Sequence, residues 1–313
     1  ASWLAAANSY SVNNQPMIPF FIYYSMFGFQ RVGDMMWAAG DQLARGFMVG
    51  GTSGRTTLNG EGLQHEDGHS HIQAGIIPNC VTYDPSFAFE VAVIMQDGIN
   101  RMYGEKQEDV FYYMTTLNEV MDQPAMPAGA EEGIRKGLYK FETVEGKKGK
   151  GHVQLLGSGA IMRHVREAAQ ILAKDYGVTS DVFSAPSFNE LAREGHDAAR
   201  WNLLHPTETQ RVPYVAQVLA DLPTVASTDY VKAYADQIRA FVPSRHYHVL
   251  GTDGFGRSDS RANLREHFEV DARYVVVAAL SQLAKEGTVS NQVVADAIAK
   301  FGLNVDRINP LYA

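Results

Sequence analysis

The sequence predicts an α/β protein of two domains, each with a mostly parallel sheet flanked by helices. Short β-branched and aromatic runs alternate with segments of helical spacing along most of the 313 residues, which is the pattern of sheets covered on both faces. Hydrophobic residues make up 45% of the chain and charged residues 20%, so it can bury a substantial core. The alternation breaks at residues 117–150, where prolines and glycines collect. We therefore expect domains at residues 1–125 and 126–313.

The first series of elements follows a short opening helix. An aromatic and β-branched run at residues 17–24 reads as a buried strand. Further strands are expected at residues 47–50, 80–83 and 110–116, and helices at 27–45, 71–77 and 85–103. Helical spacing in the first of these helices predicts that one face carries Val32, Met35, Met36, Ala39 and Leu43.

The second series repeats the alternation after the break. Strands are expected at residues 153–156, 181–185, 224–227 and 248–250, and helices at 161–176, 188–205, 231–241, 261–268, 272–285 and 291–301. The turn Gly157-Ser158-Gly159 lies between a strand and a helix. It lacks the G-x-G-x-x-G spacing of a dinucleotide site, so we interpret it as a plain strand-to-helix turn.

Composition excludes several classes of function. A net charge of -8 offers no clustered basic face for nucleic acid, and the short Lys147–Lys150 run reads as a solvated loop. Cys80 is the single cysteine. It lies in a predicted strand, so we expect it to be a buried core residue. A single cysteine is also typical of a reducing compartment, and we expect the protein to be cytoplasmic. No apolar run is long enough to cross a bilayer, so no membrane association is expected.

Two polar or aromatic segments follow neighbouring strands of the first series. One is Tyr23–Phe29, and the other is the long segment Gly50–His71, which concentrates three histidines among carboxylates. Ligands bind outside the carboxyl ends of parallel strands, so both segments should face one edge of the sheet. Aromatic rings beside histidines and carboxylates suit a flat heterocyclic cofactor and a reaction with proton transfers.

A zinc site is the main rival interpretation of the Gly50–His71 segment. The run His65-Glu66-Asp67-Gly68-His69 matches H-E-x-x-H, in which two histidines one helical turn apart bind zinc. That chemistry requires a regular helix. Gly68 lies inside the run and Gly60 and Gly62 precede it, so we expect no metal site here, although a zinc hydrolase stays an alternative.

The residues of three segments resemble those of a known family. Its members are the homodimeric bacterial pyruvate dehydrogenases, the thiamine-diphosphate-dependent decarboxylating components of the pyruvate dehydrogenase complex. The likeness extends over nearly the whole chain and, more distantly, to the transketolase superfamily. The segments that carry it are Phe20–Arg31, Gly50–His71 and Gly251–Ser258.

The resemblance implies a fold and a role for each matched residue. Residues 1–125 would be the end of the aminopyrimidine-binding domain, and residues 126–313 a transketolase-type C-terminal domain. Phe27 would pack against the aminopyrimidine ring of thiamine diphosphate. Tyr24 and His65 would line the pocket where pyruvate reacts, with Glu61 supporting His65. The implied enzyme is an oxidoreductase that decarboxylates pyruvate and acetylates a lipoyl group. Its partners would be a second copy of the chain, the lipoyl domain and the dihydrolipoyl acetyltransferase core.

Two features of the family are missing from these residues. Nothing matches the G-D-G...N pattern that holds magnesium and diphosphate, and the glutamate that activates the aminopyrimidine would fall a few residues before Ala1. We therefore expect the chain to be the C-terminal part of a longer enzyme, inactive alone, with its magnesium site elsewhere. The alternative is a dimerisation or docking module without a catalytic role. The Gly251–Ser258 segment is left open between a catalytic and a structural role.

Overall fold

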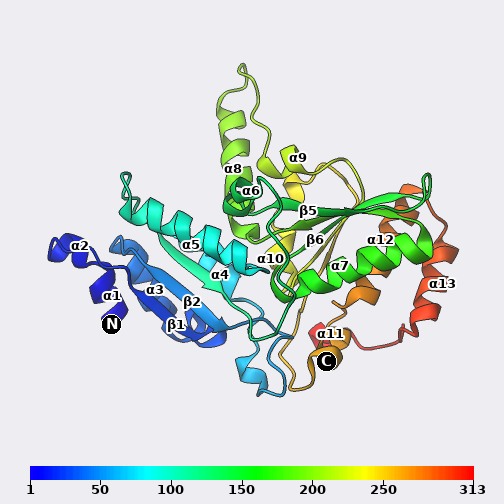
Figure 1. The fold of residues 1–313 in the computed structure, drawn as a ribbon, viewed down its shortest axis with the longest axis horizontal. Coiled ribbons are helices and arrows are strands. Elements are labelled where there is room, and N and C mark those ends of the chain that lie inside the picture. The colour runs from blue at the N-terminus through cyan, green and yellow to red at the C-terminus, as the bar shows by residue number, and fades with distance from the viewer.

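The computed structural model describes residues 1–313, and its two sheets form separate lobes (Figure 1). The first sheet is entirely parallel with the strand order β1-β2-β4-β3. Its strands are β1 (Phe20–Tyr24), β2 (Phe47–Thr52), β3 (Cys80–Tyr83) and β4 (Phe111–Thr115). Its helices are α1 (Ser2–Ala7), α2 (Ser9–Val12), α3 (Phe29–Asp41), α4 (Ser70–Gly75) and α5 (Ala88–Tyr103).

Alternating side chains bury both faces of this sheet. Met48 and Phe111 pack with residues of α3 and α4 on one face, whereas Phe47 and Tyr112 pack against α5 on the other. This is the period-two alternation of a strand covered on both sides. Cys80 is fully buried, as the sequence predicts.

The first strand differs from the prediction in burial. β1 begins at Phe20 and lies at the sheet edge, where Phe20 is 43% and Ile22 68% exposed. The predicted apolar face of α3 is also incomplete, because Val32 and Met35 are exposed while Met36 and Ala39 are buried. An edge strand has a neighbour on one side only, and burial from neighbours is not encoded in a strand's own composition.

The second sheet has the order β5-β7-β6-β8-β9, with β5 antiparallel to β7 and every other pair parallel. Its strands are β5 (Tyr139–Val144), β6 (His152–Gly157), β7 (Thr179–Ser184), β8 (Thr224–Ser227) and β9 (Tyr247–Leu250). One face packs against α7 (Met162–Ile171) and α12 (Ala272–Glu286), and the other against α8 (Phe188–Leu204) and α10 (Lys232–Asp236). The two sheets flanked by helices confirm the predicted fold class.

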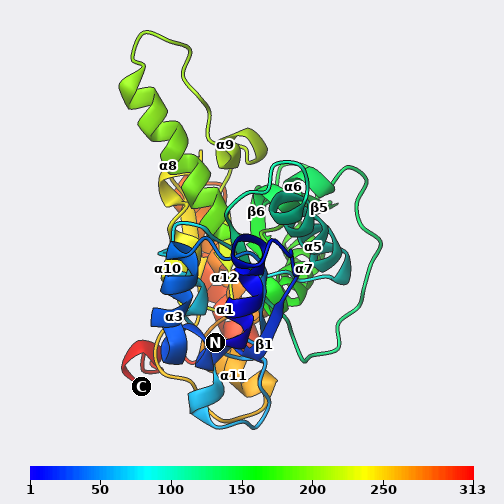
Figure 2. The same ribbon diagram turned by 90° about the vertical axis from the view of Figure 1, so that its left-hand side faces the viewer.

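The helices of the second part are α6 (Glu131–Lys136), α7 (Met162–Ile171), α8 (Phe188–Leu204), α9 (Tyr214–Val218), α10 (Lys232–Asp236), α11 (Arg261–His267), α12 (Ala272–Glu286) and α13 (Asn291–Phe301). The outer part of α8 and the chain that follows it project from the body (Figure 2). None of the helices in the chain combines the length and the apolar character that a membrane crossing requires.

Several elements differ from the sequence-based prediction. β5, α6 and α9 were not expected, since they are short or lie among glycines and prolines. The predicted helix 161–176 is α7 followed by a π-helical turn at Leu172–Tyr176. The predicted helix 231–241 is divided into α10 and a 3-10 turn at Arg239–Phe241.

A buried hydrogen-bond network centred on Asp84 connects the carboxyl ends of strands from the two sheets. Asp84, which follows β3, accepts hydrogen bonds from Thr115 Oγ1 at 2.7 Å and from Ser158 Oγ at 2.8 Å. Burial raises the pKa of this carboxyl to about 7, and the two hydroxyl donors oppose the shift. The turn at Gly157–Gly159, expected to be a plain strand-to-helix turn, therefore also joins the two parts of the chain.

Candidate active site

Three aromatic side chains, from the end of β1 and the segments that follow β1 and β2, meet at the carboxyl edge of the first sheet. Tyr24 ends β1, and the 3-10 turn that follows it carries Phe27. The ring of His65 lies 5.4 Å from the Tyr24 ring and 5.1 Å from the Phe27 ring, measured between centroids. The structure thus brings together the residues that the strand-end argument and the resemblance single out. Tyr24 is exposed and the other two are half-buried, so the rings form an open surface.

Hydrogen bonding defines the orientation of the His65 ring. Its Nδ1 lies 3.3 Å from the carbonyl oxygen of Gly62, which can only accept. Nδ1 therefore carries the proton in the neutral ring, and Nε2 keeps a free lone pair. Glu61 Oε2 lies 4.0 Å from the same Nδ1, beyond hydrogen-bond distance. Glu61 is thus positioned to act on His65 by its charge.

Asp229 anchors the start of the Gly50–His71 segment to the second part of the chain. Its carboxylate is fully buried beyond β8 and accepts hydrogen bonds from Thr56 N at 3.1 Å, Thr56 Oγ1 at 2.7 Å and Thr57 Oγ1 at 2.9 Å. Burial raises the pKa of Asp229, and the charge of Arg265 and these donors oppose the shift. The long segment is therefore held in place by its contacts, although it has little regular structure.

Arg265 links Thr56 to Glu119, which lies in the connection between the two sheets. Arg265 Nε donates to Thr56 Oγ1 at 3.2 Å, and its guanidinium also pairs with Glu119. Burial alone would raise the pKa of Glu119, but the hydrogen bonds and charge of Arg265, together with Arg163 and Arg261, hold that pKa below its ordinary value.

The Gly251–Ser258 segment packs directly on the turn that carries His65. The Arg55 guanidinium donates to Gly254 O, and Gly60 N donates to Asp259 O at 3.0 Å. A Cβ atom at Gly256 would lie 2.7 Å from both Glu66 Cβ and Leu63 O. Figure 1 shows these two parts of the chain side by side. The segment therefore has a structural role at the site.

Replacing Gly256 with alanine is expected to lower the free energy of unfolding by about 1–3 kcal/mol, because the new methyl group overlaps the His65 turn. Gly33→Ala is the matched control. No atom lies within 4 Å of a Cβ placed there, and the position is within α3, so alanine should stabilise by roughly 0.5–1 kcal/mol. Urea denaturation of the two variants measures both. Equal stability of Gly256→Ala and wild type would contradict the packing.

The structure does not contain the regular helix that a zinc site at His65 and His69 would require. The 3-10 turn Leu63–His65 ends at His65, and α4 begins only at Ser70, so His65 and His69 are not on adjacent turns of one helix. His69 Nε2 instead lies 2.6 Å from Gln30 Oε1. No group of three or more His, Cys, Asp or Glu side chains is placed to hold a metal ion.

Asp67 and His71 are structural parts of the same segment. Asp67 Oδ1 accepts hydrogen bonds from the backbone N–H groups of His69 and Ser70, each at 2.9 Å. His71 is fully buried, with Nε2 3.1 Å from Thr115 Oγ1. Burial lowers the pKa of its imidazole to about 4, although the Asp67 carboxylate opposes the shift. Its ring is therefore neutral near pH 7.

Sequence reasoning missed Asp229 and Asp84 as determinants of the site. Asp84 directly follows a predicted strand and Asp229 lies two positions after one, so the strand-end argument could have identified them. A single aspartate after a strand is also a common turn residue. Only their hydrogen-bond partners in the folded structure, more than 30 residues away along the chain, distinguish these aspartates from ordinary turn residues.

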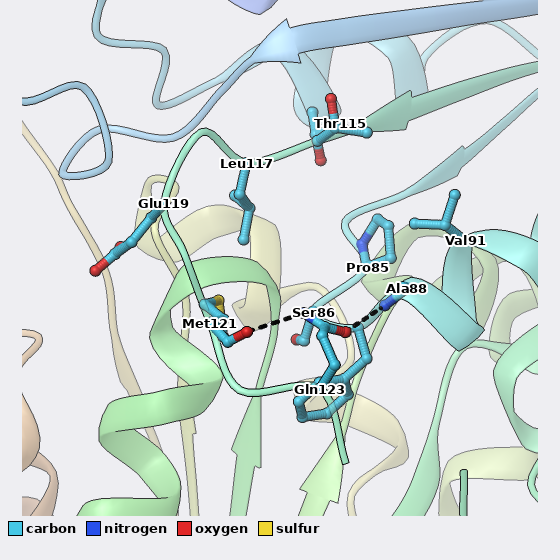
Figure 3. Close-up of a pocket in the computed structure, with 11 residues that line it drawn as sticks. Pro85, Ser86, Ala88, Val91, Thr115, Leu117, Glu119, Met121 and Gln123 are labelled. Atoms are coloured by element: carbon cyan, nitrogen blue, oxygen red, sulfur yellow. Dashed lines mark hydrogen bonds between the residues drawn. The ribbon is translucent and has the colours of Figure 1, made fainter. Parts of the chain in front are cut away.

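A separate cavity of about 200 Å³ lies beyond β3 and β4 (Figure 3). It is lined by the start of α5 and by the connection that includes Glu119 and Gln123. Gln123 Oε1 accepts a hydrogen bond from Ala88 N at 2.9 Å, and Glu90 Oε2 accepts from Phe87 N at 3.1 Å. The amide groups at this helix start are thus already paired with protein, which leaves the aromatic cluster as the better candidate site.

The two parallel-dominated sheets flanked by helices have the fold of transketolase-like proteins. Residues 1–124 match the family "Pyruvate dehydrogenase E1 component middle domain", and residues 137–271 match "Transketolase-like TK C-terminal domain". Together the two matches cover most of the chain, which is therefore similar to one part of the length of pyruvate dehydrogenase E1 components.

Curated relatives agree with the family matches, and solved structures agree with the fold. The chain is 99% identical to a pyruvate dehydrogenase E1 component of Haemophilus influenzae and 73% identical to that of Escherichia coli K12. All of the chain matches, but it spans only 35% of the length of each. Transketolase from Campylobacter jejuni shares the fold at 16% identity with a TM-score of 0.63, over 89% of this chain and 38% of that one. A split-gene transketolase, described as an inactive β4 tetramer, aligns at 14% identity with a TM-score of 0.58, over 91% of this chain and 82% of that one.

Proposed function

We propose that this chain supplies one wall of a thiamine-diphosphate site that decarboxylates pyruvate oxidatively and passes the acetyl group to a lipoyl group. The observation that carries the proposal is the meeting of Tyr24, Phe27 and His65 at the carboxyl edge of the sheet. The high identity to proteins named pyruvate dehydrogenase E1 component supports this choice of substrate.

The aromatic cluster fits the flat ring of the cofactor. Phe27 is half-buried and has the Arg31 guanidinium carbon 5.1 Å from its ring centroid, which leaves part of an apolar ring surface for stacking. Phe27 would hold the aminopyrimidine by this contact. Bound thiamine diphosphate would supply the electron sink that makes loss of carbon dioxide from a 2-oxo acid feasible.

His65 is the residue best placed to handle protons. Its Nδ1–H is directed to Gly62 O, which leaves Nε2 free to hold or release a proton at the carbonyl oxygen of pyruvate. The Glu61 carboxylate, 4.0 Å from Nδ1, would support His65 in this role. Tyr24, exposed beside His65, would line the same pocket with its hydroxyl group.

The remainder of the site would come from outside these residues. No G-D-G...N pattern is present, so magnesium and diphosphate would be held elsewhere in the enzyme. We propose that residues 1–125 and 126–313 act as the end of the aminopyrimidine-binding domain and the C-terminal domain. The isolated chain would then be inactive.

The proposed assembly is a cytoplasmic homodimer that meets the lipoyl domain and the acetyltransferase core. The unpaired edge of β1, with Phe20, Phe21 and Ile22 all exposed, supports burial of this side by another part of that assembly.

Substituting Tyr24 with alanine in the full-length enzyme is expected to reduce kcat/KM for pyruvate about 10²-fold, because the ring beside His65 and its hydroxyl group are lost. Tyr176→Ala is the control, since Tyr176 lies beyond α7 next to Lys300 and should leave the rate unchanged. Mass photometry checks that both variants keep the wild-type mass. Wild-type turnover in Tyr24→Ala would instead favour a dimerisation or docking module.

A further inference from the structure

The side chain of Glu66, directly after His65, is buried without a hydrogen-bond partner. Its residue is 1% exposed, and neither carboxyl oxygen has a hydrogen bond. A buried polar group without a partner is unfavourable, and a buried charge is much more so. Such a group at a site needs a physical explanation.

The carboxyl group is enclosed between two segments that are far apart in the sequence. Glu66 N donates to Leu63 O at 3.2 Å and closes the turn that carries His65. From the other side, Gly256 approaches so closely that a Cβ atom there would lie 2.7 Å from Glu66 Cβ. The Gly251–Ser258 segment therefore covers Glu66, and any movement of that cover changes the support of the His65 turn.

The charged groups around Glu66 come from each of the packed segments. Arg55, from the segment after β2, is 4% exposed and its Nε is also without a partner. Asp229 after β8 and Glu61 in the same turn add negative charge. Arg257 contributes its backbone N–H, while its own guanidinium bonds to Gly256 O and Ala313 O. No ion pair joins Arg55 to Glu66, so no positive group neutralises the carboxylate by contact.

We propose that Glu66 is a positioning residue for His65, and that its neutral carboxyl keeps the Gly251–Ser258 segment closed on the His65 turn. Ionisation would place an unpaired charge beneath that segment. The segment would then open to water, and His65 would lose its alignment with Tyr24 and Phe27. This rests on the proposed function, because it adds proton control to the same site.

The sign of the pH dependence follows from burial. Burial raises the pKa of Glu66 to about 8, while the backbone N–H of Arg257 and the charge of Arg55 oppose the shift. A folded-state pKa above the unfolded value means that the closed turn is most favoured below the ordinary carboxyl pKa. That advantage declines as pH rises and is lost once pH passes through about 8.

The test compares the full-length enzyme with Glu66→Gln, which has the shape of the neutral acid and cannot ionise. We expect similar kcat/KM at about pH 6. The ratio of kcat/KM for Glu66→Gln to that for wild type should then rise about tenfold as pH increases from about 6 to about 8. Glu208→Gln is the control, since Glu208 is exposed on the projecting part of the chain. A ratio that stays flat with pH, or a Glu66→Gln variant with little activity at any pH, would overturn the proposal.

A second readout does not depend on turnover. Hydrogen-exchange protection factors for residues 60–68 and 251–258 should fall in the wild-type enzyme as pH rises toward about 8, level off above it, and stay constant in Glu66→Gln. If Glu66→Gln fails to fold, the protection factors of the wild-type enzyme decide alone. Protection factors that stay constant with pH would then refute the proposal. If the enzyme does not decarboxylate pyruvate but protection changes as expected, the proposed function fails and the role of Glu66 in closing the turn stands.

Discussion

Replacing His65 with alanine in the full-length enzyme is expected to lower pyruvate turnover by about 10²- to 10⁴-fold, the usual effect of removing a positioned acid or base. The reason is geometric. His65 is the ionisable side chain whose ring contacts both Tyr24 and Phe27, and its Nε2 has no hydrogen bond within the protein. Steady-state kinetics with pyruvate measures the loss, and the mass of the assembled enzyme should not change.

His69→Ala is the matched control for this prediction. His69 belongs to the same segment, but its Nε2 is hydrogen-bonded to Gln30, and its ring is not among the contacts of Tyr24 and Phe27. A much smaller loss is expected. Equal losses in the two variants would show that disturbance of the segment, rather than the His65 ring, causes the effect.

Replacing Asp229 with alanine is expected to reduce the free energy of unfolding by about 3 kcal/mol. The buried carboxylate accepts hydrogen bonds from both the backbone and the hydroxyl of Thr56 and from Thr57. Its loss leaves these donors buried without partners. Chemical denaturation measures the change, and protease cleavage within residues 50–71 should become faster as the anchor is lost.

The control for this prediction is Asp236→Ala. Asp236 pairs with Arg239 on the surface, where both side chains are nearly half exposed, and exposed pairs contribute at most about 1 kcal/mol. A denaturation midpoint for Asp229→Ala equal to that of Asp236→Ala would contradict the assigned anchoring role.

The course of the chain in the first sheet could be predicted from sequence because its signals are local. The apolar strand runs and the polar segments that follow them predicted that Tyr24 and the Gly50–His71 segment lie at one edge of the sheet. In the structure the rings of Tyr24 and His65 are in contact there. The burial of β1 was predicted wrongly, since an edge strand and a central strand have similar composition. β5 was missed because it runs antiparallel in a glycine-rich region.

The support of the site could not be predicted because it depends on contacts between distant residues. Thr56 and Asp229 are separated by 173 positions, and no local pattern identifies one as the partner of the other. Glu66 shows the same limit. Its sequence context resembles a zinc motif, whereas its environment is set by Gly256 on a segment that follows β9.

The central claim is that Tyr24, Phe27 and His65 form the pyruvate-facing wall of a thiamine-diphosphate site. A structure of the full-length enzyme with thiamine diphosphate and magnesium tests it most directly. We predict that the aminopyrimidine ring lies against Phe27 and that His65 Nε2 faces the reactive carbon of the thiazolium. Cofactor bound away from these three side chains, for example in the cavity beside Gln123, would contradict the account.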